Sequence, residues 1–568
     1  MHPRIRSRAH RALGIGLVVV ASCESRPPAS QEGFSSPELA HVVLDGAFHH
    51  WRNAMAAIDP SVTAGDTARD AALAPLTPET IRRSLELLDR ARQDLERVER
   101  SPLTPDAKAS LALLRARIDA DEADLAVLRR PERDASFAPA VVRRSLRALD
   151  RETQEPALRA RLEAVPAYLE GSRDILQFPW RIHTEIAIQE TDALLADLDA
   201  MIPPSATAGD HETPPFDAAV AAAHGAAEQH AKWLRFHLAN STQGHHGIGR
   251  EAFEKLLASE SGLEITCDRV AELGESEIDA AQRRLEAAAH SLRPDGTVDD
   301  ALATLESDRA EDAAQLDALA RGAIDEAAAF VRTTRFATLP SGLRLQAAIA
   351  PRVDPIGGLA VLDFRRDGRG TASDAVFRVS PPASELSRIR IAEWYGALAP
   401  ARMRLIALDQ TVPGRALEEA VRAACPDRIR RTASVAGFTE GWPAYARRAA
   451  VAAGFGKDDA RIALADASAD LVLGARAVAA ARIHEGRMTI AEAVNLFRDR
   501  AHLPADLAER EARLCAADPL RALAVVGRRE LEQIAGAMQE RKGSRGAAHD
   551  AILAAGALPF PALRAWLD

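Results

Sequence analysis

Histidine and carboxylate side chains recur at helical spacing in the segment 215–238. His224 and Glu228 are four residues apart, and His230 and His237 are seven apart. Such spacings place side chains on shared faces of a helix, where imidazole and carboxylate groups could bind a metal ion. Nothing else in the sequence converges on these residues, and histidines are common on helix surfaces. We therefore favour a structural role for them.

Motifs that would define an activity by themselves are absent from the sequence. There is no Gly-x-Ser-x-Gly elbow, no phosphate-binding Gly-x4-Gly-Lys loop and no His-Glu-x-x-His zinc helix. Gly247, Gly249 and Ala252 match the loose dinucleotide-binding pattern, but no strand is expected before them. A glycine-rich start of a helix is the better interpretation.

Two segments carry the residues that could do chemistry. Residues 408–417 read Leu-Asp-Gln-Thr-Val-Pro-Gly-Arg-Ala-Leu, and residues 438–446 read Phe-Thr-Glu-Gly-Trp-Pro-Ala-Tyr-Ala. They resemble the two signature segments of the bacterial domain of unknown function 885, whose members look like zinc metallopeptidases. Members typically read His-Glu-x-x-Pro-Gly-His-His and Glu-Gly-Trp-Ala-Leu-Tyr-Ala-Glu. Residues 249–278, 481–494 and 518–527 resemble other helices of the family, so the resemblance implies a large helical body with a central cleft.

The first segment differs from the family pattern at the positions whose side chains zinc chemistry would require. Asp409 stands at the first His, Gln410 at the Glu, and Arg415 and Ala416 at the two later His residues. A glutamine amide cannot take a proton from metal-bound water, and Ala416 offers no ligand atom. Arg415 brings a permanent positive charge to the place of a cation. The resemblance therefore implies that the zinc of the family, and any other cofactor, is lost here.

Glu440 stands at the position of the family's carboxylate ligand. A carboxylate that has lost its metal can be neutralised by an arginine, and Arg415 is the cation gained in the same site. We predict that a Glu440–Arg415 ion pair replaces the metal. Pro413 and Gly414 match the family and are expected to preserve the bend between two helices.

Two aromatic residues of the second segment and one later histidine are further candidates for the cleft. Trp442 and Tyr445, three apart on a helix, could contact a ligand, although core packing is the favoured interpretation. His484 corresponds to a histidine of the family, and Ala480 replaces an Asp often found four residues before it. Arg447 replaces the family's second Glu.

Apolar periodicity predicts a mainly helical chain. Apolar residues recur at three and four between His41 and Arg130, and Thr77-Pro78 and Thr104-Pro105 each predict a helix start, as in a helical hairpin. Further helices are expected at 139–148, 155–176, 179–201 and 215–238, one or two long helices at 267–332, and helices again from 384 onward, including a capping box at Thr489 and Glu492.

One region has the pattern of β-structure. Residues 343–349, 359–364 and 376–379 are short apolar or alternating runs, separated by glycine-containing turns near 355–358 and 366–370. The expectation is a small antiparallel sheet inserted around residues 343–380 in the helical body.

The first residues predict export. A basic start is followed by an apolar run over 12–22, about half the roughly 20 residues that a membrane-spanning helix needs. Val20 to Cys23 resembles the bacterial lipobox, which implies cleavage before Cys23 and a lipid on that cysteine. An ordinary signal peptide containing a cysteine is the alternative. Glu24, in place of a retention Asp, favours the outer membrane in a two-membrane bacterium, and the polar residues up to Ser36 form a tether.

Composition limits the remaining possibilities. The 72 basic and 82 acidic residues give a net charge of −10 and are interspersed, which excludes a nucleic-acid footprint. Aromatic residues make up 4 %, as expected of a mainly helical protein. Cys267, Cys425 and Cys515 allow one disulfide at most. We expect a signal peptide over 1–22, a tether over 23–36 and a single large helical peptidase-like domain over 37–568.

Three functions are compatible with these features. The favoured hypothesis is a catalytically inactive relative of zinc peptidases, held on the cell envelope as a binding or interaction protein with a peptide-like ligand. The alternative is an active metal-dependent hydrolase whose rearranged site uses Asp409, Glu440 and a distant histidine. A third is an envelope lipoprotein whose cleft is filled by side chains.

Overall fold

The computed structural model describes most of the chain after the tether. The described residues are 33–34, 36–63, 70–177, 179–201, 215–238, 241, 247–350, 358–366 and 373–568. The predicted signal peptide, Cys23 and most of the tether lie outside this part. No helix of the described part is long and apolar enough to cross a bilayer.

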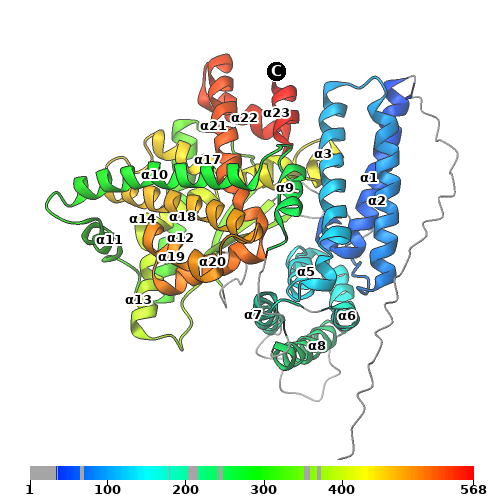
Figure 1. Cartoon of the computed structure of the whole chain (residues 1–568), viewed down its shortest axis with the longest axis horizontal. Coiled ribbons are helices and arrows are strands. Elements are labelled where there is room, and N and C mark those ends of the chain that lie inside the picture. Colours follow the sequence, from blue (N-terminus) through cyan, green and yellow to red (C-terminus); the bar gives the residue numbers. More distant parts are fainter. Residues whose placement is uncertain are drawn as a thin grey trace, which may run out of the picture.

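Three long helices form one end of the molecule (Figure 1). They are α1 (Pro37–Ile58), α2 (Pro78–Glu99) and α3 (Pro105–Glu122). Thr77 and Thr104 each accept a hydrogen bond from a backbone N–H of the first turn, and a proline follows each of them. Proline at the first helical position loses no intrahelical hydrogen bond, so the two predicted helix starts are confirmed.

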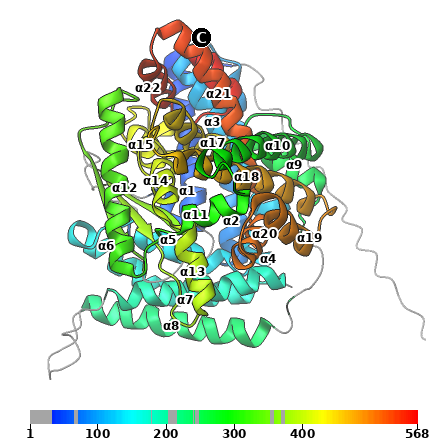
Figure 2. The ribbon, with the colours of Figure 1, turned by 90° about the vertical axis from the view of Figure 1, so that its left-hand side faces the viewer.

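A second group of helices lies below this end. It contains α4 (Arg130–Arg133), α5 (Phe137–Arg147), α6 (Arg151–Ile175), α7 (Arg181–Asp199) and α8 (Pro215–His237). Figure 2 shows α7 and α8 running side by side along the lower edge. Arg143 of α5 binds Glu190 and Asp197 of α7, each at 3.0 Å, and so fixes the two helices to each other.

The C-terminal half forms the larger helical body. Its helices are α9 (Arg250–Ser259), α10 (Cys267–Leu292), α11 (Val298–Glu306), α12 (Ala313–Thr334), α13 (Arg388–Ala397), α14 (Pro400–Gln410), α15 (Arg415–Ala423), α16 (Arg428–Thr432), α17 (Ala436–Ala452), α18 (Ala460–His484), α19 (Ile490–Ala501), α20 (Ala505–Ala517), α21 (Leu523–Lys542), α22 (Arg545–Ala555) and α23 (Phe560–Leu567). Short helical turns at Pro60–Thr63 (η1), Ala123–Val127 (η2) and Pro519–Ala522 (η4) join neighbouring helices.

The local signals of this half are mostly confirmed. Gly249 precedes α9 as its N-cap, which supports the glycine-rich helix start, and Thr489 and Glu492 form the predicted capping box. The expectation of one or two helices over 267–332 is wrong, because three are present. A capping box at Thr297 and an N-cap at Asp312 each begin a new helix there.

The β region is a three-stranded mixed sheet. Strands β1 (Leu343–Ile349), β2 (Ala360–Arg366) and β3 (Ser373–Val379) occur in the order β1-β3-β2. β2 and β3 are antiparallel, but β1 is parallel to β3, so the prediction of an antiparallel sheet is wrong. Alternation along each strand indicates which side chains are buried, and it carries no information on which strand is the neighbour.

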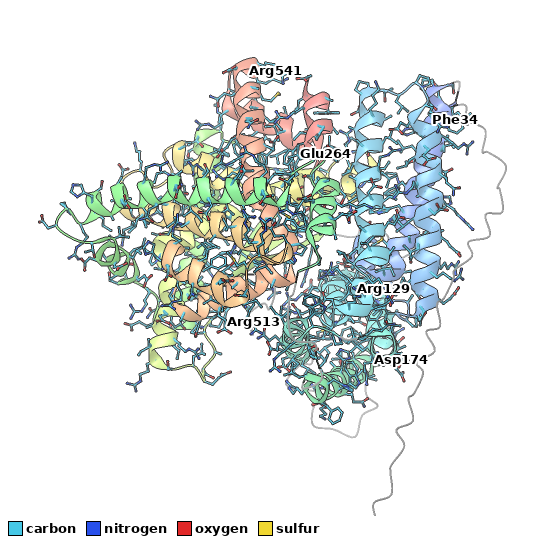
Figure 3. The ribbon with its side chains drawn as sticks, viewed as in Figure 1. Phe34, Arg129, Asp174, Glu264, Arg513 and Arg541 are labelled. Carbon is cyan, nitrogen blue, oxygen red and sulfur yellow. The ribbon has the colours of Figure 1, made fainter. Side chains whose placement is uncertain are left out.

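The apolar core runs through most of the described chain. One cluster of buried side chains reaches from Ala40 of α1 to Leu563 of α23, and a smaller cluster under the sheet includes Leu316 and Phe377. The two helical groups are also joined at their surfaces. In Figure 3, Arg513 of α20 lies where the C-terminal body meets the lower group, and it pairs with Glu185 of α7.

Candidate functional site

A cavity of about 1570 Å³ lies where the helical groups meet the sheet. Its walls come from α1, α5 and α7 on one side, from α14 to α18 and α20 on the other, and from strand β2. Of the residues predicted for the site, Asp409, Gln410, Arg415 and Glu440 line it. The structure therefore brings the two signature segments to one cavity.

The first segment forms the predicted bend between two helices. α14 ends at Gln410 and α15 begins at Arg415. A Cβ atom added to Gly414 would lie 2.1 Å from the carbonyl oxygen of Asp409. Because real Cβ contacts are never that short, only glycine fits this turn, and Pro413-Gly414 is a structural element as expected.

Arg415 and Glu440 form the predicted ion pair. Arg415 donates from Nη2 to Oε1 of Glu440 over 2.9 Å, and both side chains are partly exposed to the cavity. Burial would raise the pKa of Glu440, but the guanidinium of Arg415, with Arg521 and Arg476 as further cations, outweighs it and holds that pKa below its usual value. Glu440 is thus ionised, and the positive charge of Arg415 balances its negative charge.

Asp409 faces a second arginine. Its Oδ1 lies 3.3 Å from Nε of Arg447, whose guanidinium also binds Asp466 and Asp470. Burial, together with the neighbouring charges of Asp466 and Asp470, raises the pKa of Asp409 to about 7, although Arg447 opposes the shift. Asp409 and Arg447, two positions at which the sequence was expected to differ from the family pattern, therefore contact each other.

Zinc does not fit these residues. A zinc site needs three protein donors around one point and, for hydrolysis, a carboxylate base beside the metal-bound water. Ala416 is fully buried without a donor atom, Gln410 contributes only an amide, and Glu440 is held by Arg415. Throughout the described residues, no three histidine, cysteine or carboxylate side chains are placed to hold an ion.

Trp442 and Tyr445 are part of the core and do not line the cavity, which corrects their assignment as cleft candidates. Trp442 is fully buried and donates from Nε1 to the carbonyl oxygen of Pro413 over 3.0 Å. The hydroxyl of Tyr445 is 2.8 Å from Nε2 of His549, whose Nδ1 is 2.8 Å from the carbonyl oxygen of Phe336. Packing, the favoured interpretation of both side chains, fits these contacts.

His484 also lies away from the cavity. Its ring stacks on Phe253, and Nε2 is 3.0 Å from the carbonyl oxygen of Cys515. His484 therefore closes the end of α18 against α9 and α20, and it is not the distant histidine that a rearranged metal site would need.

The remaining candidate ligands are separated from one another. Nε2 of His224 is 3.1 Å from Oδ1 of Asp199, and His230 is buried, where desolvation lowers its pKa to about 3. Cys267, Cys425 and Cys515 are buried free thiols, so the one disulfide that the sequence allows is not formed.

Sequence reasoning missed the cationic lining of the cavity. Among its described lining residues there are thirteen arginines and seven carboxylates, and no lysine. The arginines are Arg52, Arg143, Arg144, Arg147, Arg402, Arg415, Arg422, Arg428, Arg431, Arg447, Arg476, Arg510 and Arg521. They come from elements spread over 470 residues of an acidic chain, so no sequence window shows them together.

Fold and site together define a large helical protein with an arginine-rich cavity, in which no three of the described histidine, cysteine or carboxylate side chains are placed to hold an ion. The chain belongs to the family described as bacterial protein of unknown function (DUF885), which it matches over residues 61–567. No curated protein matches it.

Two solved structures share the fold. A candidate lipoprotein of unknown function from Shewanella oneidensis has a TM-score of 0.68 at 16 % identity, over 94 % of this chain and 99 % of that one. A candidate lipoprotein from Colwellia psychrerythraea has a TM-score of 0.73 at 15 % identity, over 93 % of this chain and 98 % of that one. At these identities the likeness extends to the fold alone.

Proposed function

We propose that this protein is an envelope lipoprotein that resembles a zinc metallopeptidase, is catalytically inactive, and binds a peptide-like ligand in its arginine-lined cavity. The observation that carries the proposal is the Arg415–Glu440 ion pair. A guanidinium fixed on the remaining carboxylate excludes a second cation by Coulomb repulsion, and the general base of the family is an amide here.

The cavity suits binding by its size and its mixed lining. Ligand pockets for small molecules usually have about 300–1,000 Å³, and this cavity is larger. Apolar side chains such as Leu302, Leu362 and Val472 alternate with the arginines on its walls. A chain molecule that carries both apolar and charged groups would satisfy both kinds of surface.

Zinc analysis of the purified protein tests the loss of catalysis. We expect well under one zinc per chain and no metal-dependent cleavage of peptides, because the donor set is incomplete. The matched variant combines Asp409→His, Gln410→Glu, Arg415→His and Ala416→His, and it should gain zinc once circular dichroism shows that it folds. One zinc per unmodified chain, or peptide cleavage that a chelator stops, would support the hydrolase built on Asp409, Glu440 and a distant histidine.

The anchor is proposed from the lipobox-like residues before Cys23, and the two structural neighbours are themselves candidate lipoproteins. Mass spectrometry of the protein extracted from membranes should find a diacylglyceryl-modified Cys23 at the mature N-terminus. The variant Cys23→Ala should lose the lipid and leave the membrane fraction after export. A soluble wild-type protein with an unmodified N-terminus would identify an ordinary signal peptide.

A further inference from the structure

Strand β2 is an edge strand that borders the cavity. In the order β1-β3-β2 it pairs with β3 on one side only. The consecutive residues 358–364 all line the cavity. A strand that presents one side-chain face to a space contributes every second residue, since successive side chains point to opposite faces. An unbroken run therefore indicates that the backbone edge of β2 faces the cavity.

The hydrogen-bond register identifies which backbone groups point outward. Ser380 donates its N–H to the carbonyl oxygen of Leu359 over 2.9 Å, so these two residues form a hydrogen-bonded pair of the antiparallel ladder. Bonded and non-bonded pairs alternate along such a ladder. The N–H and C=O groups of Ala360, Leu362 and Phe364 therefore point away from β3, toward the cavity.

The opposite strand agrees with this assignment. Val379 lies across from Ala360, and its carbonyl oxygen accepts from the N–H of Ala350 over 2.8 Å on the far side of β3. Within the described residues, no backbone hydrogen bond uses the outward groups of Ala360, Leu362 or Phe364. Unpaired strand edges of this kind are templates for another extended chain.

Cations flank this edge. α14 and α15 pack beside β2 and contribute Arg402, Arg415 and Arg422 to the cavity wall. Arg402 is held by Glu306 at 2.6 Å and Arg422 by Glu418 at 2.9 Å, and neither carboxylate lines the cavity. The counter-charge of Arg402 thus lies outside the cavity lining, whereas Arg422 also pairs with the cavity-lining Glu419 at 3.4 Å.

The wall across from α14 and α15 repeats the arrangement. Arg143 and Arg147 of α5 line the cavity and are both bound by Asp197, which does not, while Arg143 also pairs with the cavity-lining Glu190. Arg147 also lies 3.5 Å from Asp363 of β2, which places this cationic wall next to the strand. An extended chain beside β2 would have guanidinium groups on both sides.

We propose that β2 is the docking edge for an extended acidic peptide, which adds to the sheet as a fourth strand. Its main chain would bond to Ala360, Leu362 and Phe364, and its carboxylates would pair with the arginines on either side. This inference rests on the proposed binding function and specifies its ligand class. Charge complementarity selects the acidic peptide over a neutral or basic one.

Fluorescence anisotropy with labelled nine-residue peptides tests the proposal on the full-length mature protein. The probe alternates Glu and Leu, and its charge-reversed control alternates Lys and Leu. Two further isomers of the probe carry N-methyl groups on the odd or on the even residues. In strand addition only every second peptide N–H faces β2. One isomer should therefore bind at least about tenfold more weakly than the unmethylated probe, and the affinity of the other should stay within about threefold of the probe's. Equal effects of both isomers, or equal binding of the Lys peptide, would overturn the proposal.

A protein variant tests the same contact from the other side. Leu362→Pro removes an outward N–H and no ladder bond, and proline is tolerated on edge strands, so the sheet should persist in circular dichroism. We expect Leu362→Pro to lower the affinity for the Glu peptide at least about tenfold. Leu362→Ala keeps the N–H and should lower that affinity by less than about threefold. Equal losses of affinity in the two variants would assign the effect to the leucine side chain and would contradict the proposal that β2 is a docking edge.

The outcomes separate this inference from the proposed function. Tight binding of the Glu peptide that is insensitive to N-methylation and to Leu362→Pro would overturn the docking edge and leave a binding protein. Cleavage of the peptide by a zinc-loaded chain would overturn the inactive-peptidase proposal, whatever the role of β2.

Discussion

The variant Gly527→Ala should lower the free energy of unfolding by at least about 3 kcal/mol, because overpacking at rigid backbone contacts lies at the costly end of such substitutions. A Cβ atom at Gly527 would lie 2.0 Å from the carbonyl oxygen of Gly437, and one at Gly441 would lie 2.5 Å from the carbonyl carbon of Gly527. Both obstacles are backbone atoms, so α17 and α21 would have to move apart. The thermal midpoint measured by circular dichroism should fall by several degrees.

The matched control lies on the same helix. Gly536 of α21 has no atom within 4 Å of an added Cβ. Gly536→Ala should therefore raise stability by up to about 1 kcal/mol through helix propensity alone. If Gly527→Ala proved as harmless as Gly536→Ala, the close contact of α17 with α21 would be wrong.

This contact explains a signature residue that sequence alone left unassigned. Gly441 follows Glu440 in the Glu-Gly-Trp segment, and Gly527 ends the segment over 518–527 that also resembles the family. The family resemblance identifies both segments, but it does not explain why glycine is needed at either position. The structure gives the physical reason, which is the approach of two helix backbones directly behind the ion pair.

Helix starts could be predicted because their signals are local. Thr77, Thr104 and Thr489 each cap the first turn that follows them, and the capping geometry involves only the next three residues. The neighbour of β1 could not be predicted in this way. Its parallel pairing with β3 is decided by packing on α12 and on the core below the sheet, which no strand pattern encodes.

The candidate site was predictable to the same limited degree. The Glu440–Arg415 pair could be predicted, because the family resemblance indicated a retained carboxylate and a new arginine in the same site. The cationic lining did not, because each arginine looks like an ordinary solvated helix residue in its own segment. Trp442 and Tyr445 show the converse limit, since aromatic residues within a signature segment fill the core as readily as a cleft.

The second large effect is expected at Arg447, a buried arginine in the lining of the cavity. Its side chain is 2 % exposed, and it binds Asp466, Asp470 at 2.5 Å, and Asp409 at 3.3 Å. Arg447→Met should lower the free energy of unfolding by about 3 kcal/mol, because breaking a buried pair leaves a carboxylate without compensation. Chemical denaturation at neutral pH measures the loss.

Arg448 provides the matched control, since it binds the same Asp470 from a side chain that is 31 % exposed. Solvent screens a pair at that position, so Arg448→Met should cost no more than about 1 kcal/mol. Similar losses in the two variants would show that burial of the Arg447 network is not the source of its stabilisation.

The pH dependence of the Arg447→Met loss follows from Asp470. Burial works to raise its pKa, but Arg447, with other arginines, outweighs burial and holds it below the ordinary value of 3.8. A carboxyl with a lowered pKa stabilises the fold above its unfolded-state pKa and loses that contribution as pH falls through the folded-state value. The difference between wild type and Arg447→Met should therefore be largest at neutral pH and shrink as pH falls from about 4, near the pKa of Asp470 in the unfolded chain, toward its lower folded-state pKa. A difference that stays constant over this range would assign the loss to packing of the arginine side chain and not to its charge.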